Sequence, residues 1–487
     1  MQVSIRKLSE LYQHPDYRWD AEYLCFEPYK NQNIKYLSIG SVLQSSQYGL
    51  SIAMNEDGNG VKIYRMNEIS NMMCDRNILK YAPIIAEETE AYKLNDKDVL
   101  FNRTNSQVFV GRTGIFRKFS KEPMVFASYL VRLIPDVNII TPEYLTTFLN
   151  TKYGILDIKR RARISINQSN VNAEELKRVE LPLVKKELQA LASSAFDDAF
   201  EYIQISESTF NEAENILLSE LGLTNWQPKH QLTFIKNYSD TQQAGRIDAE
   251  YFQPKYDEII KAIKNYSGGW DTLDNLVRIK KCIEVGSGQY IDEGIPFVRV
   301  SNISPFEMTE EKYISEELYK ELTPNEEDIP FEKSKNHQPE QGEILFSKDG
   351  SPGIAYYLKE QPPKMIPSGG ILRLKSKTDK INNEYLTLVL NSILTQEQVN
   401  RDIGGSIILH WRPDQVKETV IPILSEEKQL EIRQKVTESF NLRKRSKHLL
   451  ESAKKAVEMA IEQDEETAIT WLQKEMQNLG AVATDGL

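Results

Sequence analysis

Cysteine and histidine are scarce in this chain of 487 residues. The three cysteines (Cys25, Cys74 and Cys282) are widely separated, and the five histidines form no HxxxH or HExxH arrangement. These numbers predict neither a disulfide framework nor a metal site, and they suit a reducing compartment. No stretch approaches the roughly 18 apolar residues of a membrane span, and Met1 opens no signal-peptide pattern. We therefore expect a cytoplasmic protein without membrane contact.

The sequence motifs of common catalytic sites are also missing. There is no GxxxxGK(S/T) phosphate loop, no GxGxxG after a strand and no GxSxG turn. The segment Gln361-Pro362-Pro363-Lys364 lacks the first and last residues of an amino-methyltransferase motif. Pro413-Asp414 and Glu426-x-Lys428 have a nuclease-like spacing, but Glu426 opens a predicted helix, where an acid complements the helix dipole. The chain is therefore expected to bind rather than to catalyse.

Positive charge is not in excess, since the formal net charge is −11. That balance argues against general coating of a polyanion, but it leaves room for local basic patches. Residues 152–163 contain five basic residues and one acid, and the run Lys159, Arg160, Arg161 and Arg163 must avoid a core. We expect this run to be a solvated surface or a contact with phosphates.

What the chain does contain is a long internal repeat. Three short blocks occur twice, in the same order, at shifts of 228, 241 and 240 residues. They are Arg18-Trp19-Asp20-Ala21-Glu22-Tyr23 with Arg246-Ile247-Asp248-Ala249-Glu250-Tyr251, Glu143-Tyr144-Leu145-Thr146 with Glu384-Tyr385-Leu386-Thr387, and Leu181-Pro182-Leu183 with Ile421-Pro422-Ile423. Such a period is too long for a solenoid, so each copy is a whole domain with its connector. The sequence between the blocks differs, which suggests similar scaffolds with different recognition surfaces.

Two segments have helical periodicity, at about 184–221 and 426–463. Large apolar residues recur every seven positions at Phe196, Ile203, Phe210 and Leu217, and again at Leu442 and Leu449. Rows of small residues accompany them, namely Ala192, Ala199, Ser206 and Ala213 in the first segment and Ser439, Ser446, Ala453 and Ala460 in the second. Small residues let another helix approach closely. We expect one antiparallel helix pair; the alternative is that each helix packs only on its own domain.

The segments between the helices indicate α/β domains with short strands, and the whole chain is expected to be α+β. Residues 98–103 and 343–348 are similar apolar strands, each followed by a Gly-rich turn, at 111–114 and 350–353. Short helices are expected at 142–151 and 383–394. The predicted parts are 1–29, an N-terminal segment; 30–183, the first mixed domain; 184–254, a central helical segment; 255–423, the second mixed domain; and 424–487, a C-terminal helix and tail.

Side chains suited to DNA gather near the predicted strand ends and just before the Leu-Pro-Leu and Ile-Pro-Ile blocks. Basic residues hold phosphates, while arginine and amide side chains at loop tips contact base edges. The candidates are Arg103, Asn105, Arg112, Lys159, Arg160, Arg161, Arg163 and Asn167 in the first half, and Arg299, Asn302, Ser347, Lys348, Ser406, His410 and Arg412 in the second. For Trp411 a core position and a stacking platform stay open.

With these blocks, the Gly-Gly-Ser-Ile-Ile turn at 404–408 and the Glu427-Lys428-Gln429 sequence, the chain resembles specificity subunits of type I restriction–modification systems. The resemblance covers nearly the whole length. It implies two target-recognition domains that each read half of a split sequence in double-stranded DNA. It also implies two long antiparallel helices that space the domains and dock two modification subunits.

The resemblance further implies that this chain binds no cofactor. S-adenosylmethionine would belong to the modification subunits, and ATP and Mg2+ would be used by the restriction subunits. Three alternatives stay open: a subunit of a methylation-only or other defence complex, a coiled-coil scaffold without a role on DNA, and a solitary nuclease.

Overall fold

The computed structural model describes residues 5, 7–9, 20–165, 168–404 and 409–484. The chain forms two compact units. Unit 1 consists of residues 1–203 and 444–487, and unit 2 of residues 204–443. Each unit contains a mixed α/β domain together with one half of each of two long helices, α7 (Lys186–Glu220) and α15 (Glu426–Glu462).

The domain of unit 1 is built around a six-stranded sheet in the order β2-β11-β7-β9-β5-β4. These strands are β2 (Leu43–Tyr48), β11 (Leu130–Pro135), β7 (Val99–Asn102), β9 (Thr113–Ile115), β5 (Met73–Cys74) and β4 (Ile69–Ser70). Smaller sheets pair β10 (Met124–Phe126), β3 (Val61–Tyr64) and β6 (Tyr81–Ala82), and β1 (Tyr36–Ser38) with β14 (Glu180–Pro182). The helices are α2 (Ala21–Cys25), α3 (Ala86–Tyr92), α4 (Pro142–Asn150), α5 (Lys152–Arg161) and α6 (Ala173–Lys177).

The domain of unit 2 repeats the central strand order as β16-β23-β19-β21. These strands are β16 (Val277–Lys281), β23 (Ile371–Ser376), β19 (Ile344–Ser347) and β21 (Ala355–Tyr357). A second sheet joins β18 (Tyr313–Ile314), β17 (Ile295–Val298) and β22 (Ile366–Pro367), and β15 (Trp270–Thr272) pairs with β25 (Val420–Pro422). The helices are α8 (Tyr238–Ala244), α9 (Pro254–Lys264), α10 (Leu273–Leu276), α11 (Glu316–Leu322), α12 (Asn383–Asn391), α13 (Ile393–Asp402) and α14 (Pro413–Lys417).

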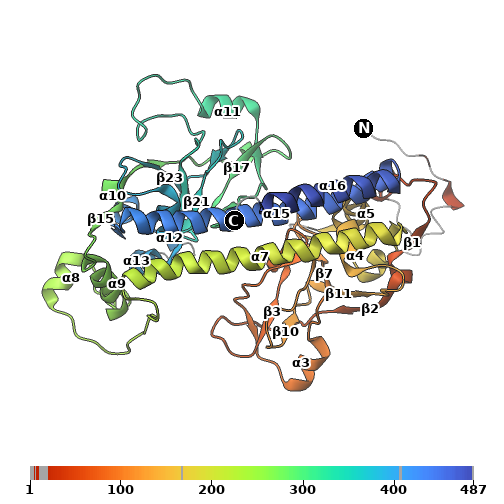
Figure 1. Ribbon diagram of the computed structural model, residues 1–487, viewed down its shortest axis with the longest axis horizontal. Helices are drawn as coiled ribbons and strands as arrows, with labels where there is room; N and C mark the ends of the chain where they lie inside the picture. The colour runs from red at the N-terminus through yellow and green to blue at the C-terminus, as the bar shows by residue number, and fades with distance from the viewer. Residues whose placement is uncertain (1–4, 6, 10–19, 166–167, 405–408, 485–487) are drawn as a thin grey trace. The chain divides into compact units, whose positions relative to one another are not determined.

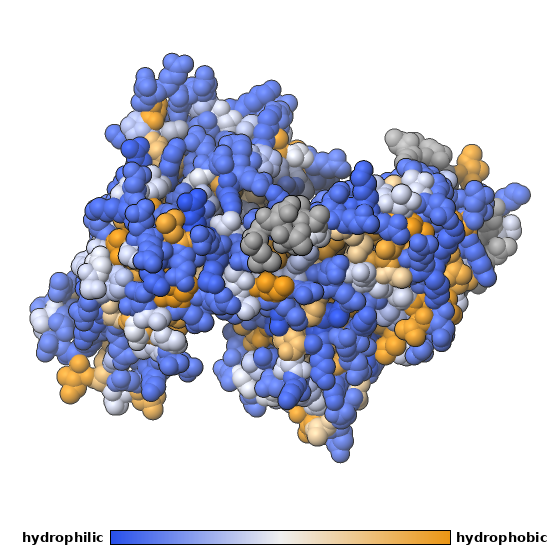
Figure 2. Space-filling view, viewed as in Figure 1, coloured by the Kyte–Doolittle hydropathy of each residue, from blue (hydrophilic) through white to orange (hydrophobic). Residues whose placement is uncertain are grey.

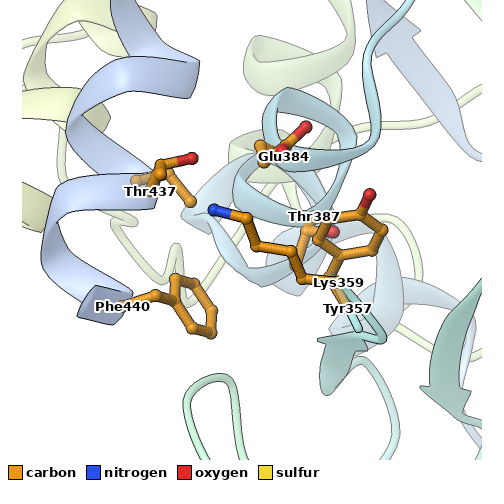
Figure 3. Close-up of a pocket in the computed structure, with 7 residues that line it drawn as sticks. Tyr357, Lys359, Glu384, Thr387, Thr437 and Phe440 are labelled. Atoms are coloured by element: carbon orange, nitrogen blue, oxygen red, sulfur yellow. The ribbon is translucent and has the colours of Figure 1, made fainter. Parts of the chain in front are cut away.

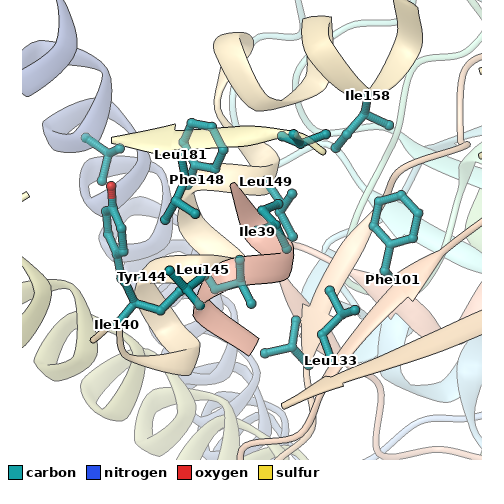
Figure 4. Packing of buried hydrophobic residues seen from close by; sticks show 14 of the residues in the cluster. Ile39, Phe101, Leu133, Ile140, Tyr144, Leu145, Phe148, Leu149, Ile158 and Leu181 are labelled. Carbon is teal, nitrogen blue, oxygen red and sulfur yellow. The ribbon is translucent and has the colours of Figure 1, made fainter. Parts of the chain in front are cut away.

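The core of unit 1 explains the Glu-Tyr-Leu-Thr block. Its apolar residues on α4, which include Tyr144, Leu145 and Phe148, pack with Phe101 of β7 and Leu133 of β11 (Figure 4). The Tyr144 hydroxyl donates to the carbonyl of Pro182 in the Leu-Pro-Leu block, and in unit 2 the Tyr385 hydroxyl donates to Pro422 over 2.9 Å. Two of the repeated blocks are therefore in direct contact with each other in each unit.

The start of each long helix is attached to its domain by one glutamine. The Gln189 side chain accepts from the Thr141 N–H (3.1 Å) and donates to the Val184 carbonyl (3.0 Å). Gln429 accepts from the Asn382 N–H (3.1 Å) and donates to the Leu424 carbonyl (2.9 Å). Both glutamines are buried, and each satisfies the N–H of the residue that caps α4 or α12 as well as a carbonyl just before its own helix.

The halves of α7 and α15 lie side by side within each unit (Figure 1). In unit 2 the contacts are Ser206 with Ser439 and Glu212 with Lys435, so that part of the pair runs antiparallel. The small residues at 192, 199, 206 and 213 are fully buried, as are those at 439, 453 and 460. A third helix, α16 (Glu465–Thr484), adds Ala468, Ile469 and Leu472 to the core of unit 1.

The six large residues expected on the helix pair divide into two groups. Phe196, Leu217, Leu442 and Leu449 are buried, and Phe196 and Leu449 belong to one cluster across the pair. Ile203 and Phe210 are only partly buried, and the ring of Phe210 contacts Phe306 of the domain in unit 2. The helices thus pack on each other through small residues and on their domains through some of the large ones.

One predicted helix is wrong at its end. The expected helix at 383–394 stops at Asn391, and a second helix begins at Ile393. Ser392 lies between them in an extended conformation (φ −75°, ψ 165°), and Thr151 has nearly the same angles between α4 and α5. The break recurs because Thr151 and Ser392 are the extended N-cap residues of α5 and α13. Figure 2 shows that most of the visible surface is hydrophilic.

Candidate nucleic-acid interface

The Asp-Ala-Glu-Tyr block anchors the helix that precedes the candidate DNA-binding residues. Asp20 accepts from the Tyr23 N–H (3.0 Å), and Asp248 accepts from the Tyr251 N–H (3.2 Å). The Tyr23 ring then lies 4.8 Å from the Arg160 guanidinium at the end of α5, and the Tyr251 ring lies 5.5 Å from Arg401 at the end of α13. The repeated block thus fixes an equivalent helix end in each unit; Arg18 and Trp19 lie outside the described residues.

After α5, a small sheet collects several predicted residues of unit 1. It has the order β12-β13-β8, with β12 (Arg163–Ser165), β13 (Gln168–Asn170) and β8 (Thr104–Asn105). All three residues of β12 are exposed, and Asn105 pairs with Ser169. Residues 104–105, which are far in sequence from 163–165 and 168–170, therefore share one small sheet with them. Asn167, a further candidate, lies outside the described residues.

Arg103 is the centre of a partly buried polar group beside this sheet. Its guanidinium stacks over the Tyr48 ring at 4.9 Å and donates to the Ser128 carbonyl and the Asn170 side chain, both over 3.4 Å. Arg112 stacks over Phe109 at 3.8 Å. These contacts hold both guanidinium groups in defined orientations, as base recognition in DNA requires.

Exposed apolar and aromatic side chains accompany these cations, and the sequence had not pointed to them. They are Tyr48, Val108, Tyr129 and Ile164, with exposed fractions of 44%, 52%, 41% and 58%. Tyr129 joins Arg103 through a backbone hydrogen bond of 3.0 Å. No sequence spacing marks this group, because its members meet only in the folded domain. Apolar contacts of this kind suit the thymine methyl and the faces of bases.

The basic run at 159–163 is not uniformly solvent-exposed, which corrects the sequence prediction. Lys159 and Arg163 are exposed, but Arg161 is 5% exposed and pairs with both Asp157 (3.0 Å) and Glu175 (3.3 Å). Arg160 pairs with Asp157 and donates to the Tyr23 carbonyl over 3.2 Å. Two of the four cations therefore stabilise the domain, because two buried or half-buried carboxylates need partners. Lys159 and Arg163 remain candidates for phosphate contact.

Unit 2 has the equivalent sheet in a reduced form. Strand β20 (Asp349–Gly350) pairs with β24 (Leu409–His410), and the Trp411 N–H donates to the Lys348 carbonyl (2.8 Å), as the Val171 N–H does to Arg103 (2.8 Å). The His410 ring contacts Asp349 through Nδ1 (2.8 Å), and Lys348 also pairs with Asp349. His410 and Arg412 are exposed. Units 1 and 2 thus present different side chains at matching positions.

Three candidates of unit 2 make hydrogen bonds or ion pairs within their own domain. Ser347 is fully buried, and its hydroxyl donates to the Ser351 carbonyl (2.6 Å). Asn302 is 4% exposed and accepts from the Arg299 N–H (3.0 Å). Arg299 pairs with Glu311. Ser347 and Asn302 therefore face the interior, where their hydrogen bonds shape turns, while Ser406 lies outside the described residues.

Trp411 is a core residue. It is 1% exposed and makes an edge contact with Phe346 at 5.7 Å. The stacking-platform interpretation is therefore wrong, because the ring is buried against Phe346 of β19 and no face of it is open to a base. The Gly350–Gly353 turn needs glycine, since Gly353 (φ +93°) and the equivalent Gly111 (φ +91°) lie close to α13 and α5.

A buried acid–arginine pair supports the central strands in both units. Glu343 forms two hydrogen bonds with Arg373 (2.6 and 2.7 Å), and Asp98 pairs with Arg132 (3.3 Å). Beside the first pair, burial and the Arg373 charge lower the pKa of Lys280 to about 8. Burial, Lys280 and Arg373 lower the pKa of His337 to about 4. These groups are held inside unit 2 and are not arranged around an open site.

Figure 3 shows a recess in unit 2. It is lined by residues of β21, α12 and α15, including Tyr357, Glu384 and Phe440, and Lys359 extends across it toward Thr437. Its surface is mainly apolar. Among the described residues, no three histidine, cysteine or acidic side chains are grouped as metal ligands would be. In the same part of the chain, no helix has the length and apolar character needed to cross a bilayer.

The chain belongs to the family described as the type I restriction modification DNA specificity domain, whose model matches residues 31–215 and 292–452. It is 29% identical over 209 residues to a putative type I restriction enzyme MjaX specificity subunit from Methanocaldococcus jannaschii. It is 28% identical over 193 residues to the EcoKI specificity subunit from Escherichia coli K12. The matches cover 40% and 39% of this chain, and 49% and 40% of those relatives.

Two solved structures of similar proteins align along most of the chain. A type I specificity subunit from M. genitalium is 13% identical with a TM-score of 0.33, and the alignment covers 91% of this chain and 97% of that one. The HsdS subunit from Thermoanaerobacter tengcongensis is 11% identical with a TM-score of 0.29, covering 89% and 98%.

Proposed function

We propose that this chain is the DNA-recognition subunit of a type I restriction–modification complex. The residues at 30–183 and 255–423 form two recognition domains, each for one half of a two-part, asymmetric target in double-stranded DNA. The observation that carries the proposal is the pair of equivalent small sheets, β12-β13-β8 and β20-β24. They follow equivalent helix ends but expose different residues, such as Arg163 in unit 1 and His410 in unit 2.

The cations of unit 1 favour DNA as the ligand. Lys159 and Arg163 are exposed, and Arg103 is oriented by Tyr48 and Asn170 at the edge of the same surface. Arginine pairs with guanine edges, exposed cations hold phosphates, and apolar side chains contact thymine. In unit 2, His410 and Arg412 are the exposed candidates beside the equivalent sheet, while Lys348, at the position that matches Arg103, is paired with Asp349.

The long helices are proposed to act as the spacer. Helix α7 has 35 residues, so it extends over roughly 50 Å at 1.5 Å per residue. Half-sites one turn of DNA apart are about 34–36 Å apart. The exposed surface of the pair is proposed to dock two methyltransferase subunits, with restriction and translocase subunits beyond them. Methyl transfer and cleavage are proposed to belong to those partners, together with S-adenosylmethionine, ATP and Mg2+.

The direct test is to map adenine methylation across the host genome by single-molecule sequencing, with and without this chain. One split, asymmetric motif that disappears on deletion would establish the recognition role and reveal the target. The same chain should bind target DNA in isolation with an affinity that falls steeply as salt rises. A coiled-coil scaffold would show neither result, and a solitary nuclease would cut plasmid DNA with divalent metal alone.

A further inference from the structure

A fourth repeated segment forms a hairpin in each unit. Residues 65–75 (RMNEISNMMCD) and 299–309 (RVSNISPFEMT) are 234 residues apart and share the initial arginine and an Ile-Ser pair. We refer to them as hairpin 65–75 and hairpin 299–309. Their shift of 234 residues lies between the shifts of the repeated blocks, which are 228, 240 and 241 residues. The two hairpins are therefore equivalent parts of the two domains.

The two hairpins are closed by the same hydrogen bonds. The Arg65 N–H donates to the Glu68 side chain (2.7 Å), and the Arg299 N–H donates to the Asn302 side chain (3.0 Å). At the other end, the Asp75 N–H donates to the Glu68 carbonyl (2.9 Å) and the Thr309 N–H to the Asn302 carbonyl (2.8 Å). Glu68 and Asn302 are both buried. The candidate DNA residue Asn302 is thus explained as the residue that closes hairpin 299–309.

Each hairpin places a large side chain at its tip toward the long helices. In unit 2, the Phe306 ring lies 4.8 Å from Phe210 of α7, 5.5 Å from Phe440 of α15 and 3.8 Å from the Arg443 guanidinium. In unit 1, Met72 is 5% exposed and belongs to one cluster with Phe196 of α7 and Leu449 of α15. The tip residue therefore contacts both long helices in unit 2, and in unit 1 it shares one cluster with residues of both.

The tip of hairpin 65–75 is a two-residue turn, since Ser70 of β4 pairs with Met73 of β5. Asn71 (φ +46°) and Met72 (φ +60°) are consecutive residues in the left-handed region, which methionine rarely adopts. The Met72 carbonyl accepts from the Ile115 N–H over 3.0 Å, which ties the tip to β9. Positive φ at both central residues is the geometry of a two-residue hairpin turn, in which asparagine and glycine are the usual residues and methionine is uncommon. A less costly residue at position 72 would be glycine, which could not reach the helices.

The hairpins contact the helices at points separate from Gln189 and Gln429, in addition to the cores that helices and domains share and to ion pairs such as Arg433 with Glu384. Each further contact along the helices restricts the directions that the domain can take. We infer that Met72 and Phe306 are positioning residues that fix how each domain is directed on the helix pair. They thereby restrict the number of base pairs tolerated between the two half-sites, without contacting DNA. This inference rests on the proposed function.

The test uses the whole chain in complex with its methyltransferase partner. Methylation is measured on a DNA library in which both half-sites are constant and the spacer varies by one base pair at a time. One base pair changes both the separation and the rotation of the half-sites, by roughly 3.4 Å and about 35°. The variants are Phe306→Ala, Phe306→Tyr, Phe210→Ala and, as a surface control in the same domain, Ile329→Ala, whose side chain is 48% exposed.

We expect the wild-type complex to prefer its own spacer over neighbouring lengths by roughly 5- to 150-fold, comparable with the cost of one mismatched base pair. Phe306→Ala should reduce that preference at least severalfold while half-site preference is unchanged. Phe210→Ala removes the contact with Phe306 from the helix side and should reduce the spacer preference in the same way. The double variant should therefore differ little from the single variants, because both substitutions remove the same contact. Phe306→Tyr and Ile329→Ala should behave as wild type.

An unchanged spacer preference in folded Phe306→Ala and Phe210→Ala complexes would overturn the inference. Loss of half-site preference together with spacer preference would also overturn it, since the ring would then act on the reading surface or on folding in general. Should Phe306→Ala fail to fold, Phe210→Ala carries the test. If the wild-type complex methylates no split motif at all, the proposed function itself is wrong, which separates the two failures.

Discussion

The hydroxyl oxygens of Ser206 and Ser439 lie 2.8 Å apart where α7 and α15 meet in unit 2. Both residues are fully buried, and they belong to the small-residue rows of the two helices. A pair of serines here allows the helix backbones to approach closely while one hydroxyl donates a hydrogen bond to the other. This contact makes the packing of the helix pair testable with small changes.

Removing one of these hydroxyls should cost more than removing both. Ser206→Ala or Ser439→Ala leaves a buried hydroxyl without its partner, and we expect each to lower the free energy of unfolding by about 1–3 kcal/mol. The double alanine variant should be nearly as stable as wild type, because no unpaired group remains. Urea titration followed by circular dichroism measures this. Additive losses in the double variant would contradict the pairing.

Arg161 and Lys159 should separate stability from DNA binding. Arg161→Ala leaves the buried side chains of Asp157 and Glu175 without this partner, so we expect a loss of about 3–5 kcal/mol in the free energy of unfolding. Lys159→Ala removes an exposed cation and should leave stability within about 0.5 kcal/mol. It should instead lower by about one the number of counterions released on DNA binding, which is given by the slope of the logarithm of affinity against the logarithm of salt concentration. Denaturation and binding titrations at several salt concentrations distinguish the two. A stable Arg161→Ala protein would contradict the structural role.

The equivalent glutamines at the helix starts should contribute similar amounts to the free energy of unfolding. Gln189→Ala and Gln429→Ala each remove the partner of a partly buried N–H, at Thr141 or Asn382, and of a buried carbonyl, at Val184 or Leu424. We expect each to cost about 1–3 kcal/mol or somewhat more, since two groups are affected. Glu187→Ala and Glu427→Ala, exposed on the same turns, are matched controls. A large loss for only one glutamine would mean that the two attachments differ in strength.

Stability should fall in mild acid because of His337. Its pKa in the folded chain is lowered to about 4 from 6.5, with burial as the main cause and Lys280 and Arg373 as further causes. Between pH 6.5 and 4 the unfolded chain takes up a proton that the folded chain does not, so unfolding becomes easier as the pH falls. His337→Gln should remove this part of the pH dependence. The difference in unfolding free energy between the two proteins, measured from pH 8 to 4, should be constant above pH 7 and change below it.

A heptad inserted into both long helices should lengthen the DNA spacer. Seven residues placed after Ile203 in α7 and after Arg443 in α15 add about 10 Å and nearly two full turns, so the packing faces are kept. We expect the methylated motif to gain about 3 base pairs in its spacer, at 3.4 Å per base pair. Methylation mapping of the variant complex reveals the new motif. An unchanged spacer would show that the helices do not set the distance.

Several features were readable from sequence because they depend on local patterns. The recurrence of large and small residues every seven positions predicted helices at 184–221 and 426–463. The structure has these helices at 186–220 and 426–462. The repeated blocks were visible because their contacts are made of the same residue types in both halves, such as Tyr144 with Pro182 and Tyr385 with Pro422. Hairpins 65–75 and 299–309 escaped notice because little beyond Arg and Ile-Ser is shared.

By itself, the sequence determined that the chain has two copies of one scaffold, a pair of long helices with small-residue rows, and a family resemblance. Only the tertiary structure decided which candidates are exposed. Arg161, Asn302, Ser347 and Trp411 looked as suitable as Arg163 or His410, yet the first four are buried. The reason is physical: burial depends on which distant segments a residue meets, such as Arg161 with Glu175 or Trp411 with Phe346, and no spacing along one strand or loop records that encounter.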